Sequence, residues 1–203
     1  MVIVRSGHGS PSTDDGLKAM FEDRKRVFVD LLRWDVPVLE DRFEIDEFDD
    51  SQATYLIVND LAGDHLGSCR LLPTTRPHIL GSLFSDLCAS PPPTGPRVFE
   101  ITRFCLSRRQ PAAARRRTRD ALVRGLADYA LGAGITTYTG VAELAWLQQI
   151  LAFGWDCRPL GPPAPRDGRL LGALAIKIDH RTSALLAATG IAADSPTPAR
   201  RAA

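Results

Sequence analysis

Cysteine, histidine and net charge are all scarce in this chain of 203 residues. Its four cysteines are widely spaced and form no C-x-x-C pair, so we expect reduced core thiols and neither a disulfide framework nor a zinc site. The formal net charge is only +1, which argues against a nucleic-acid-binding protein and against an acidic, solvating chain. Local groups of charge must therefore carry the functional information.

Long apolar runs are missing as well. No stretch is long enough to cross a bilayer, and the apolar run within residues 1–9 is too short for a signal peptide. The sequence therefore predicts a soluble protein without membrane insertion, in the reducing cytoplasm. The hydrophobic fraction of 44% is ordinary for a globular protein and can supply one sizeable core.

The spacing of apolar residues alternates between helical and strand periods along the chain. Helices are predicted at 17–32, after capping residues at 12–15, and at 82–88, 115–131, 143–153 and 181–189, and strands at 53–59, 65–72, 97–106, 135–142 and 172–179. This order indicates an α/β fold with a mixed central sheet, in one domain that covers residues 1–189. Residues 190–203 are rich in alanine, proline, serine and arginine, so we expect a disordered tail there.

Arg24 is a charge on the apolar stripe of the first predicted helix. It lies between Met20 and Phe21 on one side and Val27 and Phe28 on the other. A buried lone charge is very costly, so the guanidinium must be paired or must reach a cleft. The alternative is an arginine that extends to solvent at the edge of the stripe.

Two further segments place charge among apolar residues. Residues 44–50 hold five acidic side chains interleaved with Ile45 and Phe48, which is either a solvated loop or a carboxylate cluster that binds arginines and a cationic ligand. In the strand at 98–105, Glu100 and Arg103 occupy what should be a buried middle, as a structural ion pair or as part of a site. The two would point to opposite faces of a regular strand, so a shared cleft requires a bulge.

In chain order, these charged and aromatic positions resemble the acyl-homoserine-lactone synthases, the autoinducer synthases of bacterial quorum sensing. The matching positions are Arg24, Phe28, Trp34, Glu44-x-Asp46-x-Phe48-Asp49, Arg70, Phe84 and Glu100-x-x-Arg103-Phe104. The resemblance extends from about residue 20 to about residue 179. It implies a fold like that of the N-acetyltransferases, with a mixed, splayed β-sheet and helices on both faces.

The resemblance also implies a reaction. An acyl group carried by acyl carrier protein or coenzyme A is transferred to the amine of S-adenosylmethionine, and lactone closure releases methylthioadenosine. Neither a cofactor nor a metal is expected. The resemblance assigns the S-adenosylmethionine pocket to Arg24, Phe28, Trp34, Asp46, Asp49, Arg70 and Arg103.

The catalytic residues expected from this resemblance are Glu100 and Arg103. The amine must lose a proton before it attacks the thioester, and the Glu100 carboxylate can accept that proton directly or through one water. A strand bulge near Arg103 would free backbone N–H groups, and these could stabilise the oxyanion of the tetrahedral intermediate.

Two surfaces are expected to receive the acyl donor. The acyl chain should lie along Phe84, Thr139, Val141, Trp146 and Ile150, although the same residues could simply form core. In the family, a threonine at the position of Thr139 is associated with acyl chains oxidised at the third carbon. The donor's phosphate or an acidic carrier protein should dock on Arg115, Arg116, Arg117 and Arg119, for which the alternative is a solvated basic patch.

Two rival functions remain open at this stage. The first is an ordinary N-acyltransferase that uses acyl-coenzyme A on another amine, although residues 108–114 lack the glycine-rich loop expected of one. The second is a degenerate synthase that binds acyl chains or a partner without turnover, and the intact Glu100 and Arg103 argue against it.

Overall fold

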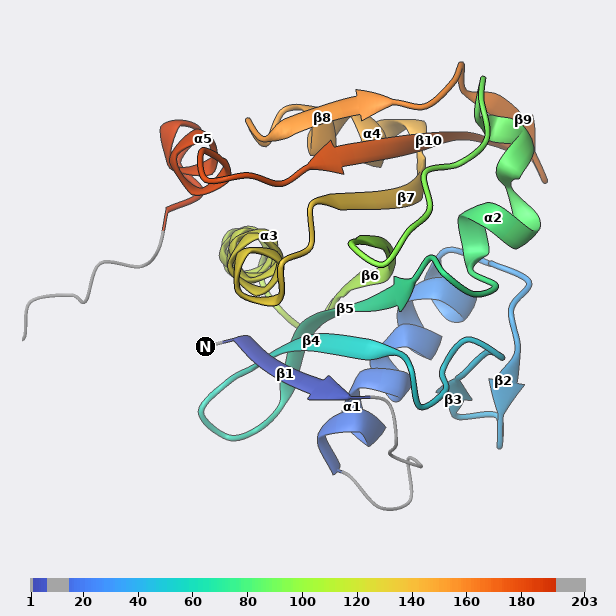
Figure 1. Ribbon diagram of the computed structural model, residues 1–203. Helices are drawn as coiled ribbons and strands as arrows, with labels where there is room; N and C mark the ends of the chain where they lie inside the picture. The colour runs from blue at the N-terminus through green and yellow to red at the C-terminus, as the bar shows by residue number, and fades with distance from the viewer. Residues whose placement is uncertain (1, 7–14, 193–203) are drawn as a thin grey trace, which may run out of the picture.

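A large mixed β-sheet, covered by helices on both faces, forms most of the described structure, and two short strands, β2 and β3, form a separate sheet (Figure 1). The computed structural model describes residues 2–6 and 15–192. The strands are β1 (Val2–Ser6), β2 (Val38–Leu39), β3 (Phe43–Glu44), β4 (Thr54–Asn59), β5 (His65–Pro73), β6 (Val98–Leu106), β7 (Thr137–Glu143), β8 (Asp156–Pro159), β9 (Ala164–Arg166) and β10 (Arg169–Lys177). The helices are α1 (Asp15–Arg24), η1 (Lys25–Leu31), α2 (Ile79–Leu83), η2 (Ser85–Leu87), α3 (Ala112–Ala133), α4 (Leu144–Leu151) and α5 (Thr182–Ala188).

The large sheet has the strand order β1-β4-β5-β6-β7-β10-β8, with β9 paired to β10. Strands β6 and β7 run parallel and pair over only three residues, from Val98 opposite Thr137 to Glu100 opposite Thr139. All other pairings among the described strands are antiparallel. Beyond Glu100 the two strands diverge, so the sheet is splayed between a first half ending at β6 and a second half beginning at β7. The predicted mixed, splayed sheet is confirmed.

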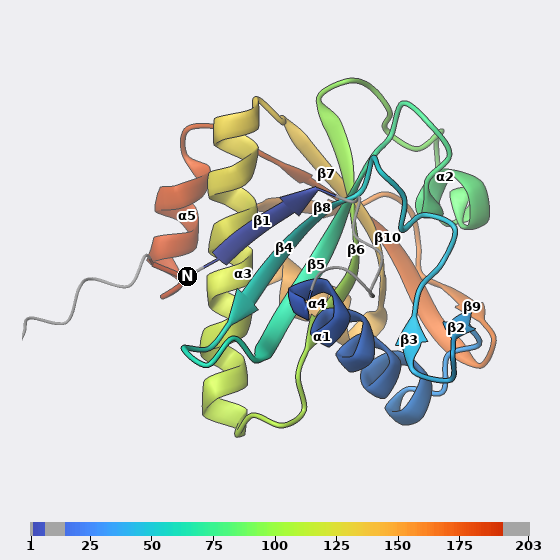
Figure 2. The ribbon, with the colours of Figure 1, turned by 90° about the horizontal axis from the view of Figure 1, so that it is seen from below.

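Different helices cover the two faces of the sheet (Figure 2), and each face carries its own core. On one face α3 packs with α4 and α5, where Leu122, Leu126 and Ala130 repeat every four residues and are fully buried. On the other face α1 packs over β4 and β5 through Leu17, Met20 and Phe21. The amphipathic pattern that predicted these helices is therefore the pattern that places them on the sheet.

Helix α3 is longer than predicted at both ends. It begins at Ala112, directly after Pro111, because proline suits the residue before a first helical turn and three alanines follow. It ends at Gly134, whose φ of +71° is the left-handed conformation typical of a helix C-terminus, with its N–H bonded to the carbonyl of Ala130. The four predicted docking arginines therefore follow the true N-terminus of the helix.

Several sequence predictions of element position need correction. The helix predicted at 82–88 is α2 at Ile79–Leu83 followed by the short turn η2, and the first helix becomes a π-helix after Arg24. Strands β1, β2, β3, β8 and β9 were not predicted because each is short or lacks a clear alternation. The tail was predicted to begin at residue 190, but Ile191 is buried in the α3-side core. Residues 193–203 of that tail, like capping residues 12–14, lie outside the described residues.

No helix in the described ranges is long and apolar enough to cross a membrane.

Candidate active site

Arg24 is fully buried and paired, not extended to solvent. Its Nε donates to Glu44 Oε2 at 2.5 Å, and its two terminal nitrogens donate to the two oxygens of Asp49 at 2.8 Å each. Burial alone would lower the arginine pKa, but Asp49 and Glu44 outweigh it and raise the pKa of Arg24 above its ordinary value. The paired alternative for Arg24 is therefore the correct one.

Arg70, on β5, repeats this arrangement. Its Nη1 lies 2.6 Å from Asp46 Oδ1 and 2.8 Å from Asp49 Oδ1, while its Nε donates to the hydroxyl of Thr102 at 2.9 Å. The Tyr55 hydroxyl also donates to Asp49, at 2.9 Å. Burial would raise the pKa of Asp49, but the adjacent arginines hold it well below its ordinary value.

Arg103 completes the set. Its Nε donates to Glu44 Oε1 at 2.9 Å and its Nη2 to Asp46 Oδ2 at 2.7 Å. Three arginines and three carboxylates thus alternate in a closed ring, which we call the charge ring: Arg24, Glu44, Arg103, Asp46, Arg70 and Asp49. Only the side chains of Arg103 and Asp46 keep measurable exposure, 10% and 8%, so the ring offers those two groups to a ligand.

A strand bulge brings Arg103 to this face. Ser68 of β5 pairs with Cys105 of β6, and Arg70 pairs with Thr102, so β6 carries one extra residue between these pairs. Arg103 adopts φ of +50°, a left-handed conformation that is uncommon for a residue other than glycine. Its side chain therefore reaches Asp46, which Arg70 also contacts, and Glu44. The structure therefore contains the bulge that Glu100 and Arg103 need if both are to face one cleft.

Glu100 is fully buried at the point where β6 and β7 separate. Burial raises its pKa to about 7, although the backbone N–H of Leu80 and the charges of Arg70 and Arg103 act in the opposite direction. That N–H donates to Oε1 at 2.9 Å, while Oε2 has no hydrogen-bond partner within residues 2–6 and 15–192. A buried carboxyl whose pKa lies near neutrality, and one of whose oxygens has no partner in the described structure, can exchange a proton with a substrate.

An aromatic pair borders the charge ring. The rings of Phe28 and Trp34 stack with centroids 4.7 Å apart and planes 13° apart, and the Arg103 guanidinium lies 5.8 Å from the Phe28 ring. The indole Nε1 of Trp34 is buried without a hydrogen-bond partner among the described residues. The π-helical turn of η1 carries Phe28, and the N–H of Trp34 bonds back to the Phe28 carbonyl.

The predicted acyl-binding residues divide between two clusters. Phe84 and Val141 pack in the core around Leu80, and the fully buried Thr139 lies opposite Glu100 with its hydroxyl unpartnered in the described structure. Trp146 and Ile150 pack instead on the α3 side of the sheet. The Trp146 ring lies 5.1 Å from the ring of Phe104 on β6, so these two rings meet across the gap between the half-sheets.

The predicted docking arginines differ in how far they are already engaged. Arg115 donates to the carbonyl of Gln110 at 2.8 Å, and Arg119 pairs with Asp120 at 2.6 Å. Arg116 and Arg117 are exposed. Arg115 lies in the first turn of α3 and the other three lie in the turn that follows, so the group begins three residues after the start of the helix, and only Arg116 and Arg117 are exposed.

Sequence reasoning missed a second buried polar cluster next to the charge ring. Asp23 accepts hydrogen bonds from Arg26 at 2.8 Å and Arg109 at 3.0 Å, and its Oδ2 lies 2.9 Å from Nδ1 of His65. Burial would raise the pKa of Asp23, but the interactions with His65 and Arg26 hold it well below its ordinary value. The available signal was that Asp23 and Arg24 are consecutive charges on a helix that buries much of its surface.

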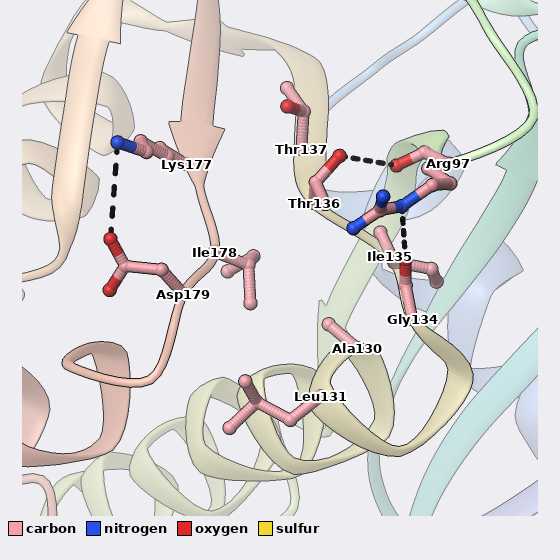
Figure 3. Close-up of a pocket in the computed structure, with 10 residues that line it drawn as sticks. All are labelled: Arg97, Ala130, Leu131, Gly134, Ile135, Thr136, Thr137, Lys177, Ile178 and Asp179. Carbon is pink, nitrogen blue, oxygen red and sulfur yellow. Dashed lines mark hydrogen bonds and ion pairs between the residues drawn. The ribbon is translucent and has the colours of Figure 1, made fainter.

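A hollow of about 530 Å³ lies between the start of β7, the end of β10 and the end of α3 (Figure 3). Arg97 crosses its wall and donates to the carbonyl of Gly134 at 2.9 Å. None of the predicted catalytic or binding residues lines it. In the part of the chain that the structure describes, no group of three or more His, Cys, Asp or Glu side chains is placed to hold a metal ion.

Comparison with known proteins places this geometry in context. Residues 11–185 match the family described as Autoinducer synthase. An acyl-homoserine-lactone synthase of Ralstonia nicotianae is 32% identical over 203 residues, covering 97% of this chain and 98% of that protein. A CoA-dependent acyl-homoserine lactone synthase, solved with SAM and isopentyl-CoA, superposes with a TM-score of 0.83 at 26% identity over 94% of this chain and 89% of that one. An acyl-CoA N-acyltransferase of Pseudomonas aeruginosa shares the fold alone, with a TM-score of 0.59 at 15% identity over 86% of this chain and 98% of that one.

Proposed function

The chain belongs to the autoinducer synthase family and is an acyl-homoserine-lactone synthase, and we propose that it joins an acyl thioester to the amine of S-adenosylmethionine at the charge ring. The observation that carries this proposal is Glu100. Its carboxyl is buried beside the splay, has a pKa of about 7, and keeps Oε2 without a partner in the described structure. These are the properties of a general base that works near neutral pH.

In the first half of the reaction Glu100 takes a proton from the substrate ammonium. The freed amine nitrogen then bonds to the thioester carbonyl carbon, the carbon–sulfur bond breaks, and the thiol leaves with a proton. The extra residue of the β6 bulge leaves backbone N–H groups outside the regular ladder, and we assign to these the stabilisation of the oxyanion. Much of the acceleration comes from holding the two reactants in contact.

In the second half the methionyl carboxylate oxygen bonds to the γ-carbon of its own chain. The bond from that carbon to the sulfonium breaks, and methylthioadenosine leaves as a neutral thioether. A sulfonium is already a good leaving group, so this half needs a folded substrate conformation more than it needs an acid. The reaction as proposed requires no cofactor beyond its two substrates.

The charge ring divides the binding work between its members. We assign direct contact with S-adenosylmethionine to Arg103 and Asp46, the two members with exposed side-chain surface. Arg24, Asp49 and Arg70 are buried in pairs with each other and with Glu44, so they hold the first two in place. The proposal therefore has fewer ring residues in direct contact with the substrate than the sequence predicted, because the sequence alone could not separate the exposed members from the buried ones.

The aromatic pair supplies the rest of the pocket. Phe28 and Trp34 offer ring surface next to Arg103, and a sulfonium cation is attracted to such faces. The unpartnered indole N–H of Trp34 is one further donor for the adenosyl group.

For the acyl chain we propose a path through the splay. It would enter beside Glu100 and Thr139, pass Val141, and reach Trp146 and Ile150 by displacing the ring contact between Phe104 and Trp146. The thioester carrier would dock on the exposed Arg116 and Arg117. The likeness to a CoA-dependent synthase solved with isopentyl-CoA supports a coenzyme A donor, and acyl carrier protein presents the same phosphopantetheine arm.

We also propose a cytoplasmic location, because both substrates are intracellular metabolites. The four cysteines are free in the structure, as that compartment favours.

The test is to mix the purified chain with S-adenosylmethionine and either acyl-coenzyme A or acyl carrier protein thioesters, and to follow methylthioadenosine by chromatography. A synthase releases methylthioadenosine in step with thiol, and mass spectrometry finds the acylated lactone. Thiol release without methylthioadenosine would instead identify an N-acyltransferase. Absence of turnover on every donor, despite tight acyl binding, would identify a degenerate synthase.

A further inference from the structure

Arg169 is the first residue of β10 and joins three parts of the molecule. Its Nη2 donates to the carbonyl of Leu32, its Nη1 lies 3.3 Å from Glu143 Oε1 at the end of β7, and its guanidinium lies 5.6 Å from the centre of the Trp34 ring. Only 28% of its side chain is exposed. Strand β10 begins at the end of the sheet opposite α5 (Figure 1). The side chain thus reaches from the second half-sheet to the segment that follows η1.

The segment that Arg169 holds is strained. Residues 25–31 form a π-helix, which is rare and less favourable than an α-helix, and Arg33 then adopts φ of +58°. Such backbone persists only where surrounding contacts hold it. The exposed fractions of Leu31 and Leu32 are 49% and 36%, so burial of these side chains contributes little to holding the turn.

The turn that ends at Trp34 sets the position of the aromatic pair, Phe28 and Trp34. Trp34 directly follows the strained Arg33, and its ring stacks on Phe28. The Phe28 ring in turn lies against Arg103 of the charge ring. The first helix packs on β5 and β6 in the first half-sheet, whereas Arg169 and Glu143 belong to the second. Arg169 therefore connects the aromatic pair, which lies on the first half-sheet, to the second half-sheet across the gap where β6 and β7 diverge.

We propose that Arg169 is a positioning residue for S-adenosylmethionine: it latches the turn at Leu32–Trp34 to the second half-sheet and so holds Trp34 in its binding position. This inference rests on the proposed function of the charge ring and aromatic pair. Arginine suits the task because its planar fork donates in two directions while its face stacks on an indole, which a lysine ammonium cannot do. Arg169 acts through its contact with Trp34 and is not proposed to react.

The experiment measures binding of methylthioadenosine and of S-adenosylmethionine to the full chain by calorimetry, without an acyl donor. Arg169→Gln should weaken both by about tenfold, from the loss of one hydrogen bond and one cation–ring contact. Arg169→Lys should recover only part of that loss. The matched control is Arg166→Gln, which removes a guanidinium from the register partner of Arg169 on β9 and should leave binding unchanged.

Kinetics and a double-mutant cycle separate positioning from general damage. Arg169→Gln should raise KM for S-adenosylmethionine and leave kcat, KM for the acyl donor and the thermal midpoint close to wild type. In a Trp34→Ala background, Arg169→Gln should cause no further loss of affinity, because its effect passes through Trp34.

The outcomes are distinguishable. Wild-type protein that binds neither compound overturns the proposed function, and this inference with it. Wild-type protein that binds, together with Arg169→Gln protein that binds equally well, overturns the inference alone. Loss of affinity that persists undiminished in the Trp34→Ala background, or that affects both substrates alike, would also refute the latch.

Discussion

Replacing Glu100 with glutamine should lower activity and should remove the loss of stability that this carboxyl causes as pH rises. The pKa of this buried carboxyl is raised from 4.5 to about 7, so the folded protein holds a proton that the unfolded chain releases. The stability tied to that proton is fully present below pH 4.5 and is lost as pH rises through 7. Between about pH 5 and about pH 8, wild-type protein should therefore lose about 2–3 kcal/mol of unfolding free energy through this group.

The variant lacks this titration and keeps the main contact of the site. A glutamine oxygen can still accept the hydrogen bond that Leu80 N–H gives to Glu100 Oε1. Its amide N–H group would take the place of Oε2 and find no acceptor among the described residues, at a cost of about 1–3 kcal/mol. That cost is the same at every pH, so it cancels when the difference between variant and wild type is compared at two pH values.

Urea unfolding of both proteins at the two pH values, without substrates, measures the effect. The stability of Glu100→Gln relative to wild type should rise by about 2–3 kcal/mol on going from about pH 5 to about pH 8. In parallel, kcat/KM of the wild type should rise with pH and level off above about 7, while the variant falls by about 10²–10⁴-fold. A relative stability that does not change with pH would show that the Glu100 pKa is ordinary, and wild-type turnover by the variant would remove Glu100 as the base.

Three further predictions concern the rest of the site. Arg24→Ala should cost about 3–5 kcal/mol in urea unfolding because it removes one of the two arginine partners of the buried Glu44 and of the buried Asp49, whereas Arg124→Ala, whose partner Asp128 is exposed on the surface of α3, should cost under about 1 kcal/mol; equal small losses would contradict the charge ring. Replacing Arg116 and Arg117 with glutamate should raise KM for the acyl donor, should leave KM for S-adenosylmethionine unchanged, and should have a smaller effect as salt is added; an equal rise in KM for both substrates would indicate misfolding. Thr139→Val should shift the product ratio from acyl chains oxidised at the third carbon toward unsubstituted chains, which corresponds to a change of about 1–3 kcal/mol in the free-energy preference between them; an unchanged ratio would make Thr139 an ordinary core residue.

Local sequence pattern was sufficient for the long elements and insufficient for the short ones. Helix α3 and strands β4, β5, β6 and β10 follow from periodicity because each buries one face or its whole length. Strand β8 has a mostly exposed pattern, and β9 has only three residues, so neither produces a signal of its own. Both are strands because β10 lies beside them, and Arg169 acquired a candidate role only when that hairpin placed it near Trp34.

For the candidate site, the sequence alone showed that Arg24, the acidic segment and Glu100 place charge among apolar residues, so that each must either find a partner or reach solvent or a cleft. It also showed that Glu100 and Arg103 could share a cleft only through a bulge. Tertiary structure alone decided which carboxylate meets which arginine, that the pairs close into a ring, and that only Arg103 and Asp46 remain open. Those outcomes depend on the register of β5 against β6 and on the left-handed backbone of Arg103, which arise from contacts between distant segments and leave no trace in local spacing.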